Sequence, residues 1–364
     1  MKKVSLLAVV TAVCLFLTAC RADVVTEKPS EDMSGAMTLE EKVGQILFVR
    51  CVEDELVDSL MEKQPGGLLM FGRDFEGLTK EEVTDKIKGF QSESKIPLII
   101  GVDEEGGTVV RVSSNPNLAP EKYASPQEIY KNGGMDALIT NAAEKSQLLR
   151  ELGITMNLAP VADVCVNGED FMYDRSMGTD AEETAECIKN IVLAMKANGI
   201  SSCLKHFPGY GGNMDTHTGS AVDERSAQSF KEITENDNGT KSGGDFIPFQ
   251  VGIDAGVDCV LVAHNIVDSL DSENPASLSP AIHDILRSEL GFDGVIMTDD
   301  IAMGAVADVE DVYIKAVNAG NDLIITTDYE TAYNQILNAV KNGMISEETL
   351  DNAVIHILKL KGLI

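Results

Sequence analysis

Residues 259–298 read CVLVAHNIVDSLDSENPASLSPAIHDILRSELGFDGVIMT. The stretch begins with a short apolar run at 259–263, continues through residues with helical spacing at 282–290, and ends in a second apolar run at 295–298. Continuous apolar runs of this length are typical of parallel strands that helices cover on both faces, because neither face of such a strand meets water. The stretch therefore predicts a strand, a helix and a second strand parallel to the first.

The same alternation recurs along most of the chain. Six further apolar runs lie at 45–50, 67–71, 98–102, 155–159, 202–206 and 323–326, and helical spacing recurs at 80–91, 181–197, 333–340 and 347–360. With the two runs above, the sequence predicts eight parallel strands alternating with helices. Eight such units are typical of a (β/α)8 barrel of the TIM type, a single-domain α/β fold. A doubly wound parallel sheet is the alternative.

The start of the barrel has its own signal. Thr38, followed three positions later by Glu41, forms a capping-box pattern directly before an apolar helical face. This pattern predicts a helix that precedes the first strand.

The first twenty residues have the pattern of an export signal. Lys2 and Lys3 precede an apolar run at 4–16, whose length suits a signal-peptide core better than a membrane-spanning helix. The next four residues, LTAC at 17–20, resemble the lipobox of bacterial lipoproteins, in which the cysteine becomes the lipidated first residue of the mature chain.

We therefore expect three segments. These are a signal peptide at 1–19, a lipidated Cys20 with a flexible polar tether over 20–36, and the barrel domain at 37–364. This organisation implies export and a lipid anchor that holds the protein on the membrane, outside the cytoplasm. An ordinary secretory signal, which would release the protein, is the alternative.

Charge and cysteine spacing exclude several classes of site. The chain has 29 Lys and Arg against 59 Asp and Glu, a formal net charge of −30. Nucleic acids are bound mainly by Lys and Arg, so we expect no nucleic-acid partner. The cysteines of the barrel segment lack CxxC spacing, which favours buried thiols over a disulfide framework or a zinc site. They are Cys51, Cys165, Cys187, Cys203 and Cys259.

Polar residues gather where the predicted strands end, which is where (β/α)8 barrels carry their active sites. Acids, bases and cations stand at the ends of five successive strands: Asp103, Glu104 and Glu105 at the third, Asn157 at the fourth, Lys205 and His206 at the fifth, His264 at the sixth, and Asp299 and Asp300 at the seventh. The sequence thus predicts one catalytic rim.

Several of these residues lie in motifs that carry a family resemblance. The motifs are MTLEEKVGQILFVR at 37–50, GGLLMFGRD at 66–74, GVDEEGGTVVR at 101–111, NLAPVADV at 157–164, DRSMG at 174–178, KHFPGYGGNMDTH at 205–217 and GFDGVIMTDDIAM at 291–303. In this order they resemble the barrel domain of family 3 glycoside hydrolases. The DxH pattern at 215–217 resembles the β-N-acetylglucosaminidase branch, which needs no second domain for its acid/base. The resemblance covers residues 37–364.

The resemblance implies the catalytic residues. It makes Asp299 the nucleophile of a retaining mechanism, which forms a covalent glycosyl-enzyme. It gives the acid/base role to His217, a residue type that in general titrates near neutral pH, and Asp215 would fix the tautomer of the ring. The alternative for Asp299 is a helix N-cap, a role that suits Asp300 better. The alternative for the DxH loop is a surface loop bonded only to backbone.

The DxH loop departs from the usual pattern of that branch. Asp215 lies ten positions after Lys205, one fewer than usual, and GYGG at 209–212 stands where GHGD is common. Its glycines predict a loop able to move over a bound sugar.

The same resemblance implies the sugar-binding residues. They are Asp103, Arg111, Arg175, Lys205 and His206. A carboxylate can accept from two hydroxyl groups of a sugar while cationic side chains donate from the other side. The alternative for the lysine and the arginines is structural ion pairing with nearby acids.

The expected function is that of an exo-acting β-N-acetylhexosaminidase. It would hydrolyse terminal β-linked N-acetylglucosamine from cell-wall fragments or other glycans, without a metal or cofactor. The alternatives are a β-glucosidase-type or phosphorolytic enzyme of the same family, and a non-catalytic glycan-binding lipoprotein. A metal-dependent hydrolase is a further alternative, with His206, His217, His264 and Asp299 as ligands.

Overall fold

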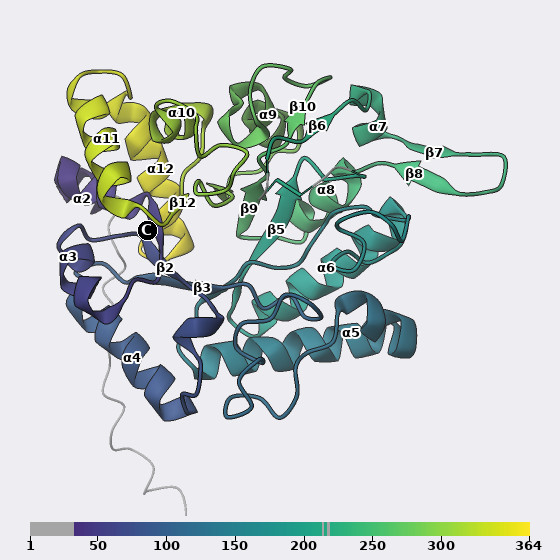
Figure 1. Ribbon diagram of the computed structural model, residues 1–364, viewed down its shortest axis with the longest axis horizontal. Coiled ribbons are helices and arrows are strands. Elements are labelled where there is room, and N and C mark those ends of the chain that lie inside the picture. The colour runs from purple at the N-terminus through teal and green to yellow at the C-terminus, as the bar shows by residue number, and fades with distance from the viewer. Residues whose placement is uncertain (1–32, 213–214, 217–218) are drawn as a thin grey trace, which may run out of the picture.

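The computed structural model describes residues 33–212, 215–216 and 219–364. Eight strands form one parallel sheet in the order β11-β9-β5-β4-β3-β2-β1-β12. A parallel bridge between Met297 of β11 and Leu323 beside β12 brings the two edges together, so the sheet forms a nearly closed barrel (Figure 1). The predicted α/β barrel of the TIM type is confirmed, and the doubly wound alternative is wrong.

Each predicted apolar run contributes one strand of the barrel. The strands are β1 (Leu47–Arg50), β2 (Gly67–Met70), β3 (Ile99–Val102), β4 (Met156–Asn157), β5 (Ser201–Phe207), β9 (Cys259–Val262), β11 (Val295–Thr298) and β12 (Ile324–Thr326). Every residue of β2, β3, β9 and β11 is buried. Burial on both faces explains why the sequence is continuously apolar there.

Helices surround the barrel. They include α2 (Leu39–Gln45), α3 (Val57–Glu62), α4 (Lys80–Glu93), α5 (Pro126–Glu151), α6 (Ala181–Ala197), α8 (Phe246–Asp254), α9 (Pro280–Asp284), α10 (Val312–Ala319), α11 (Tyr329–Lys341) and α12 (Glu347–Leu360). The capping box before the first strand is confirmed, because Thr38 and Glu41 exchange side-chain to backbone hydrogen bonds at the start of α2. The helix predicted at 282–290 is instead split between α9 and a π-helical turn, Ile285–Glu289.

The barrel interior is shaped by one large side chain and two glycines. Phe48 of β1 is fully buried. A Cβ on Gly101 of β3 would lie 2.5 Å from Cζ of Phe48, and one on Gly67 of β2 would lie 3.0 Å from its Cδ2. Only glycine leaves room for the ring at these two positions. The ring of Phe48 therefore fills the barrel across two neighbouring strands.

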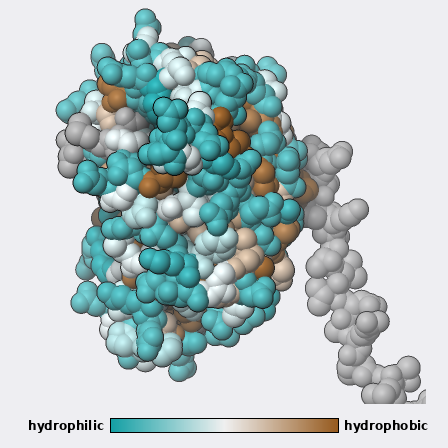
Figure 2. Space-filling model, turned by 90° about the vertical axis from the view of Figure 1, so that its right-hand side faces the viewer, coloured by the Kyte–Doolittle hydropathy of each residue, from teal (hydrophilic) through white to brown (hydrophobic). Residues whose placement is uncertain are grey.

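Long segments follow several strands and build the carboxyl-terminal rim. The segment after β5 carries β6 (Val222–Asp223), α7 (Ala227–Lys231) and an antiparallel hairpin, β7 (Ile233–Glu235) with β8 (Lys241–Gly243). The hairpin projects away from the barrel at the right of Figure 1. The face seen in Figure 2 is mostly hydrophilic with small scattered hydrophobic patches, in keeping with the acidic composition.

The described part of the chain contains no helix that is long and apolar enough to span a membrane. The proposed signal peptide and Cys20 lie outside the described residues. Within the barrel domain, Cys51, Cys165, Cys187, Cys203 and Cys259 are buried and have free thiols.

Candidate active site

A cavity of about 390 Å³ opens at the carboxyl-terminal end of the barrel. The predicted site residues that line it are Asp103, Arg111, Arg175, Lys205, His206 and Asp299. They come from the ends of β3, β5 and β11 and from the segments after β3 and β4. Six of the eight predicted catalytic and sugar-binding residues therefore meet in one pocket.

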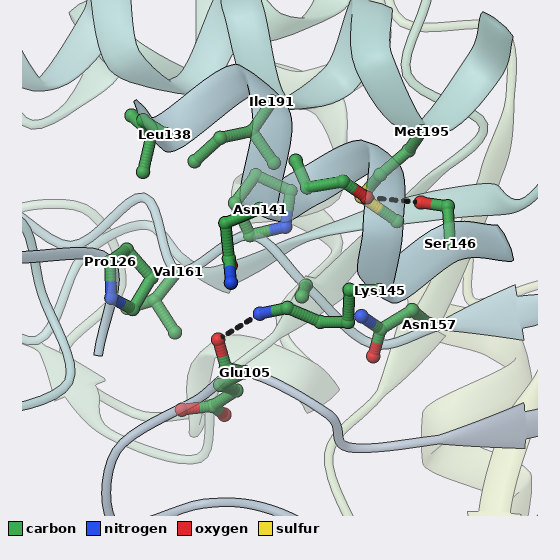
Figure 3. A pocket seen from close by; sticks show the side chains of 13 residues that line it. Glu105, Pro126, Leu138, Asn141, Lys145, Ser146, Asn157, Val161, Ile191 and Met195 are labelled. Atoms are coloured by element: carbon green, nitrogen blue, oxygen red, sulfur yellow. Dashed lines mark hydrogen bonds between the residues drawn. The ribbon is translucent and has the colours of Figure 1, made fainter. Parts of the chain in front are cut away.

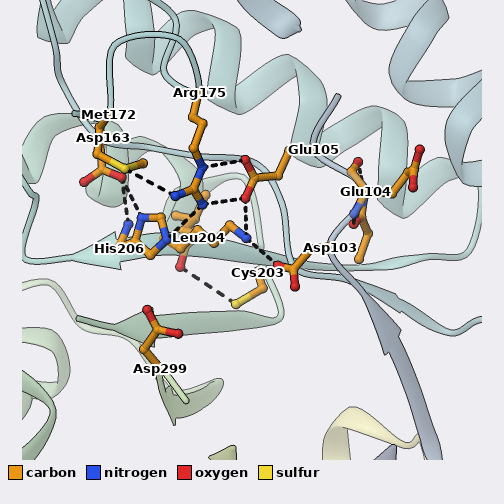
Figure 4. A network of polar contacts seen from close by, with 12 residues as sticks. Asp103, Glu104, Glu105, Asp163, Met172, Arg175, Cys203, Leu204, His206 and Asp299 are labelled. Carbon is orange, nitrogen blue, oxygen red and sulfur yellow. Dashed lines mark hydrogen bonds and ion pairs between the residues drawn. The ribbon is translucent and has the colours of Figure 1, made fainter. Parts of the chain in front are cut away.

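Glu105 joins the cationic side chains of the pocket (Figure 4). Its Oε1 lies 2.7 Å from Nη2 of Arg175 and 2.6 Å from Nζ of Lys205, and its Oε2 accepts from Nε of Arg175 at 3.0 Å. Burial of Glu105 opposes its ionisation, but the charges of Lys205 and Arg175 hold its pKa well below the ordinary value. Glu105 is therefore a carboxylate that fixes both cations.

Lys205 is a buried lysine that stays charged. Only 2% of its side chain is exposed, and its Nζ also lies 2.7 Å from Oδ1 of Asp103. Burial would lower the pKa of Lys205, but the carboxylates of Asp103 and Glu105 raise it above the ordinary value. The ion-pairing alternative for Lys205 and Arg175 is correct as geometry, and both residues still line the pocket.

The segment after β3 is held by a second, buried glutamate. Both carboxylate oxygens of Glu104 accept backbone N–H groups, from Arg111 and Val112 at 2.7 Å and from Ser113 at 3.2 Å. Asn157 at the end of β4 bonds to both backbone polar groups of Glu104, at 2.9 and 3.0 Å. These contacts fix the segment that places Asp103, Glu105 and Arg111 around the cavity.

His206 has both ring nitrogens in contact with charged groups. Its Nδ1 lies 2.8 Å from Oδ2 of the fully buried Asp163, and its Nε2 lies 3.3 Å from Nη2 of Arg175. A guanidinium can only donate, so Nε2 accepts, and Nδ1 carries the proton and donates it in a hydrogen bond to Oδ2 of Asp163. Asp163 therefore selects the tautomer of His206.

Asp299 lies at the mouth of β11, facing this array (Figure 4). Burial would raise the pKa of its carboxyl, but His264, His206, the N–H of Asp300 and Lys205 together hold the pKa below the ordinary value. The N–H of Asp300 donates to Oδ1 of Asp299 at 2.8 Å. The carboxylate is therefore ionised at neutral pH, as a nucleophile requires.

Asp300, next to Asp299, stabilises the turn after β11. Its Oδ1 accepts the N–H of Ala302 at 2.9 Å and so caps the turn after β11, while Oδ2 lies 3.4 Å from Nη1 of Arg50. His264 is buried outside the cavity lining, where Nε2 donates to the carbonyl oxygen of Asp300 at 3.0 Å. Its Nδ1 lies 2.7 Å from Oγ of Ser277.

The glycines at 209–212 serve close packing as well as backbone freedom. Gly209 has φ 117° and Gly211 has φ 53°. A Cβ on Gly209 would lie 2.6 Å from Oδ1 of Asp245, and one on Gly211 would lie 2.5 Å from Cζ of Arg225. Arg225 and Asp245 form an ion pair at 2.8 Å, and Arg225 donates to the carbonyl oxygen of Gly209 at 3.3 Å. In its described part, residues 209–212, this loop is held by its contacts with Arg225 and Asp245.

The predicted acid/base dyad is described in part. Asp215 is partly exposed and does not line the cavity, while Thr216 beside it is fully buried. His217 lies outside the described residues. The structure therefore places Asp215 but not the imidazole that it would orient.

The sequence analysis assigned no individual function to four residues that are important for this geometry. Glu105 and Asp163 hold the predicted side chains, Tyr210 lines the cavity, and Lys145 lies behind it. Glu105 stood in a rim motif, but nothing in EEGG shows which glutamate points into the pocket. Asp163 carried no signal beyond its place in NLAPVADV.

Lys145 of α5 occupies a second, largely apolar cavity (Figure 3). Its side chain is 7% exposed, and Nζ donates to the backbone carbonyl oxygen of Glu105 at 2.6 Å. Burial lowers the pKa of Lys145 to about 8, although Glu104 and Glu105 oppose that change. Glu105 lines both cavities and separates them.

A fold with this rim of carboxylates and cations allows a sharper comparison with known proteins. The sequence matches the glycosyl hydrolase family 3 N terminal domain over residues 38–360. The chain belongs to glycosyl hydrolase family 3. The resemblance found in the motifs is thereby confirmed, and the chain is a glycoside hydrolase by family.

Curated relatives of this family 3 chain carry a common description. A protein named Beta-hexosaminidase from Stenotrophomonas maltophilia (strain R551-3) is 31% identical over 301 residues, which cover 80% of this chain and 85% of that protein. Beta-hexosaminidase LpqI from Mycobacterium tuberculosis is 27% identical over 341 residues, covering 88% of this chain and 82% of the relative.

Solved structures of family 3 proteins share the barrel. A β-N-acetylglucosaminidase of family 3 from Paenibacillus sp. str. FPU-7 matches with a TM-score of 0.82 and 29% identity, over 90% of this chain but 63% of that one. A family 3 glycosyl hydrolase from Mycobacterium smegmatis matches with a TM-score of 0.79 and 25% identity, over 90% of this chain and 98% of that one.

Proposed function

We propose that this family 3 chain is an exo-acting β-N-acetylhexosaminidase that removes terminal β-linked N-acetylglucosamine from cell-wall fragments or other glycans. The observation that carries the proposal is the placement of the Asp299 carboxylate opposite a buried, ion-paired array of carboxylates and cations in one pocket. The relatives named β-hexosaminidase support the choice of sugar. A pocket bounded by the barrel rim suits the end of a glycan better than its middle.

In the first step, Asp299 acts as the nucleophile. Its carboxylate attacks the anomeric carbon, the bond from that carbon to the leaving oxygen breaks, and a covalent glycosyl ester forms. Protonated His217 gives its proton to the leaving oxygen. The depressed pKa of Asp299 supports this role, because a protonated carboxyl has no charge to direct at the sugar.

In the second step, His217 acts as the base. It removes a proton from water, the water oxygen bonds to the anomeric carbon, and the ester bond to Asp299 breaks. Each of the two steps inverts the configuration of the anomeric carbon, so the product retains the β configuration. Asp215 would orient the imidazole and stabilise its protonated form.

The ion-paired array would bind the sugar. Asp103 accepts from hydroxyl groups, while Arg111, Arg175, Lys205 and His206 surround them. Because Glu105 fixes Arg175 and Lys205, and Asp163 fixes His206, before substrate arrives, little ordering of these three side chains remains to be done on binding.

The proposal also includes where the enzyme is located in the cell. The LTAC sequence supports a lipid on Cys20, a signal peptide at 1–19, a tether over 20–36 and a barrel domain at 37–364. The lipid would then anchor an exported enzyme to the membrane. Metabolic labelling of the expressed chain with a clickable fatty acid tests this, with Cys20→Ser as the unlabelled control.

A chromogenic assay tests the activity. We expect the protein to hydrolyse an aryl β-N-acetylglucosaminide faster than the matching β-glucoside, and the first product to be the β anomer by NMR. Preference for the glucoside would contradict the proposed sugar, and sugar 1-phosphate formed in phosphate buffer would indicate phosphorolysis. Sugar binding without turnover, unchanged in Asp299→Ala, would indicate a binding protein. Activity lost with a chelator and restored by a metal would indicate the metal-dependent alternative.

A trapping experiment tests the nucleophile. A 5-fluoro N-acetylglucosaminyl fluoride forms its glycosyl-enzyme faster than it is hydrolysed, so the intermediate accumulates. We expect mass spectrometry to find the added sugar on the peptide that contains Asp299, and Asp299→Ala to lose roughly a thousandfold or more in kcat. A label on another carboxylate would reassign the nucleophile.

A further inference from the structure

Tyr210 connects two parts of the site that are distant in the sequence. Its backbone N–H donates to Oδ1 of Asp163 at 2.8 Å, and the other carboxylate oxygen of Asp163 accepts the hydrogen bond from Nδ1 of His206. The ring of Tyr210 packs edge-on against the His206 ring, with 5.3 Å between the centroids. The side chain is 2% exposed and lines the cavity. Tyr210 is therefore fixed to the sugar-binding side of the pocket.

The other end of Tyr210 reaches Thr216. The phenol oxygen and Oγ1 of Thr216 share a hydrogen bond, in which either group can donate. The carbonyl oxygen of Thr216 accepts the N–H of Ala305 at 3.2 Å, in the segment that follows Asp299 after β11. Thr216 is itself fully buried. Thr216 is thus held from two sides, by the hydroxyl of Tyr210 and by the N–H of Ala305.

We infer that Tyr210 is a positioning residue for acid/base catalysis, acting through its hydroxyl contact with Thr216. The inference rests on the proposed function, in which the next residue, His217, carries the proton. Consecutive Cα atoms are about 3.8 Å apart, so the contact that holds Thr216 lies one peptide unit from the expected acid/base. Without the phenol hydroxyl, Thr216 keeps its hydrogen bond from Ala305 but loses its link, through Tyr210, to Asp163 and His206.

One further feature fits this role. Burial raises the pKa of Tyr210, so the phenol stays protonated and able to form a hydrogen bond at the pH of catalysis.

The test uses Tyr210→Phe, which removes the hydroxyl and keeps the ring, with two N-acetylglucosaminides. One releases a sugar and so needs a proton on its leaving oxygen, whereas the other releases 2,4-dinitrophenolate and does not. For the sugar-releasing substrate we expect kcat/KM to fall about tenfold to a hundredfold, a fraction of what a general acid contributes. For the dinitrophenyl substrate we expect kcat/KM, which reports the first step, to change less than about twofold, because that step needs no acid.

Two more variants complete the experiment. Thr216→Val should reproduce the selective loss, and the double variant should be no worse than the worse single variant, because both remove the same contact. The matched control is Tyr313→Phe, which removes the hydroxyl from another buried tyrosine–threonine hydrogen bond, that of Tyr313 with Thr326. This variant should leave the ratio of the kcat/KM values for the two substrates unchanged.

The outcomes separate the inference from the function on which it rests. Equal losses on both substrates would show that Tyr210 supports sugar binding through His206, and no loss would show that the contact is unimportant; either result overturns the inference. If the wild-type protein cleaves neither substrate, the proposed function itself fails. Circular dichroism and the melting temperature of each variant identify any loss that comes from unfolding.

Discussion

The ammonium group of Lys145 lies 2.6 Å from the backbone carbonyl oxygen of Glu105, on the side of that residue opposite the carboxylate that binds Arg175 and Lys205. One residue is thus held through its backbone by a cation from α5 and through its side chain by two cations of the pocket. The ion-paired side chains of the pocket are supported in this way by a lysine that does not line the pocket.

Lys145→Met should weaken substrate binding more than turnover. The substitution keeps the length of the side chain but leaves the Glu105 carbonyl oxygen without that donor, so the segment after β3 loses one of its supports. We expect KM for the aryl N-acetylglucosaminide to rise about threefold to tenfold, as the loss of about one hydrogen bond implies, with kcat within about twofold. Steady-state kinetics measure both values. A fall in kcat with unchanged KM would contradict this role.

The same variant should change how stability depends on pH. Burial lowers the pKa of Lys145 from 10.5 to about 8, so below pH 8 both folded and unfolded states carry the charge and the full cost of burying it is present. Between pH 8 and 10.5 the folded state releases the proton first, and this cost disappears. The stability of Lys145→Met relative to wild type should therefore fall by about 3 kcal/mol from pH 7 to pH 10.5. Urea unfolding at both pH values measures this, and a constant difference would contradict it.

Asp163→Asn should impair the pocket by disturbing His206. An amide nitrogen turned toward Nδ1 can only donate, which favours the tautomer with its proton on Nε2, facing the donor Nη2 of Arg175. Loss of a hydrogen bond to a charged group implies that kcat/KM falls about tenfold to a hundredfold. Kinetics combined with NMR of the histidine ring nitrogens check the rate and the tautomer. An unchanged tautomer with unchanged rate would show that Asp163 is dispensable.

Gly209→Ala should destabilise the clamped loop. The backbone there has φ 117°, and the new Cβ would meet Asp245 at 2.6 Å, so we expect a loss of about 1 to 3 kcal/mol in the free energy of unfolding. Gly89→Ala on α4 is the matched control, because a Cβ there would meet no atom of another element within 4 Å and alanine favours a helix. Chemical denaturation should show opposite signs for the two variants. Equal stability of both would contradict the packing role of Gly209.

The strands could be predicted because their signal is local. A strand buried on both faces must be apolar throughout, and the runs at 259–263 and 295–298 met that condition. The capping box at Thr38 was equally local, since its partners are three residues apart. The split of the helix at 282–290 was not predictable, because the π-helical turn leaves the apolar spacing almost unchanged.

Only the site residues that lie in recognisable sequence motifs could be predicted. The motifs identified the residues that line the pocket, but Asp163 and His206 are 43 positions apart, and no local pattern shows that they touch. The same holds for Lys145 and Glu105, which are 40 positions apart. For Gly209 and Gly211, mobility was predicted from composition, whereas the structure shows that side chains of Arg225 and Asp245 occupy the space of the absent Cβ atoms.

The barrel closes between β11 and β12 through the bridge at Met297 and Leu323, whereas the neighbouring pair β11 and β9 aligns over the whole length of β11. This seam has one bridged residue pair, fewer than any other junction of the barrel, and Asp299 directly follows β11. Amide protons along the seam should exchange with solvent sooner than those between β2 and β3, so that thermal opening of the barrel begins beside the proposed nucleophile.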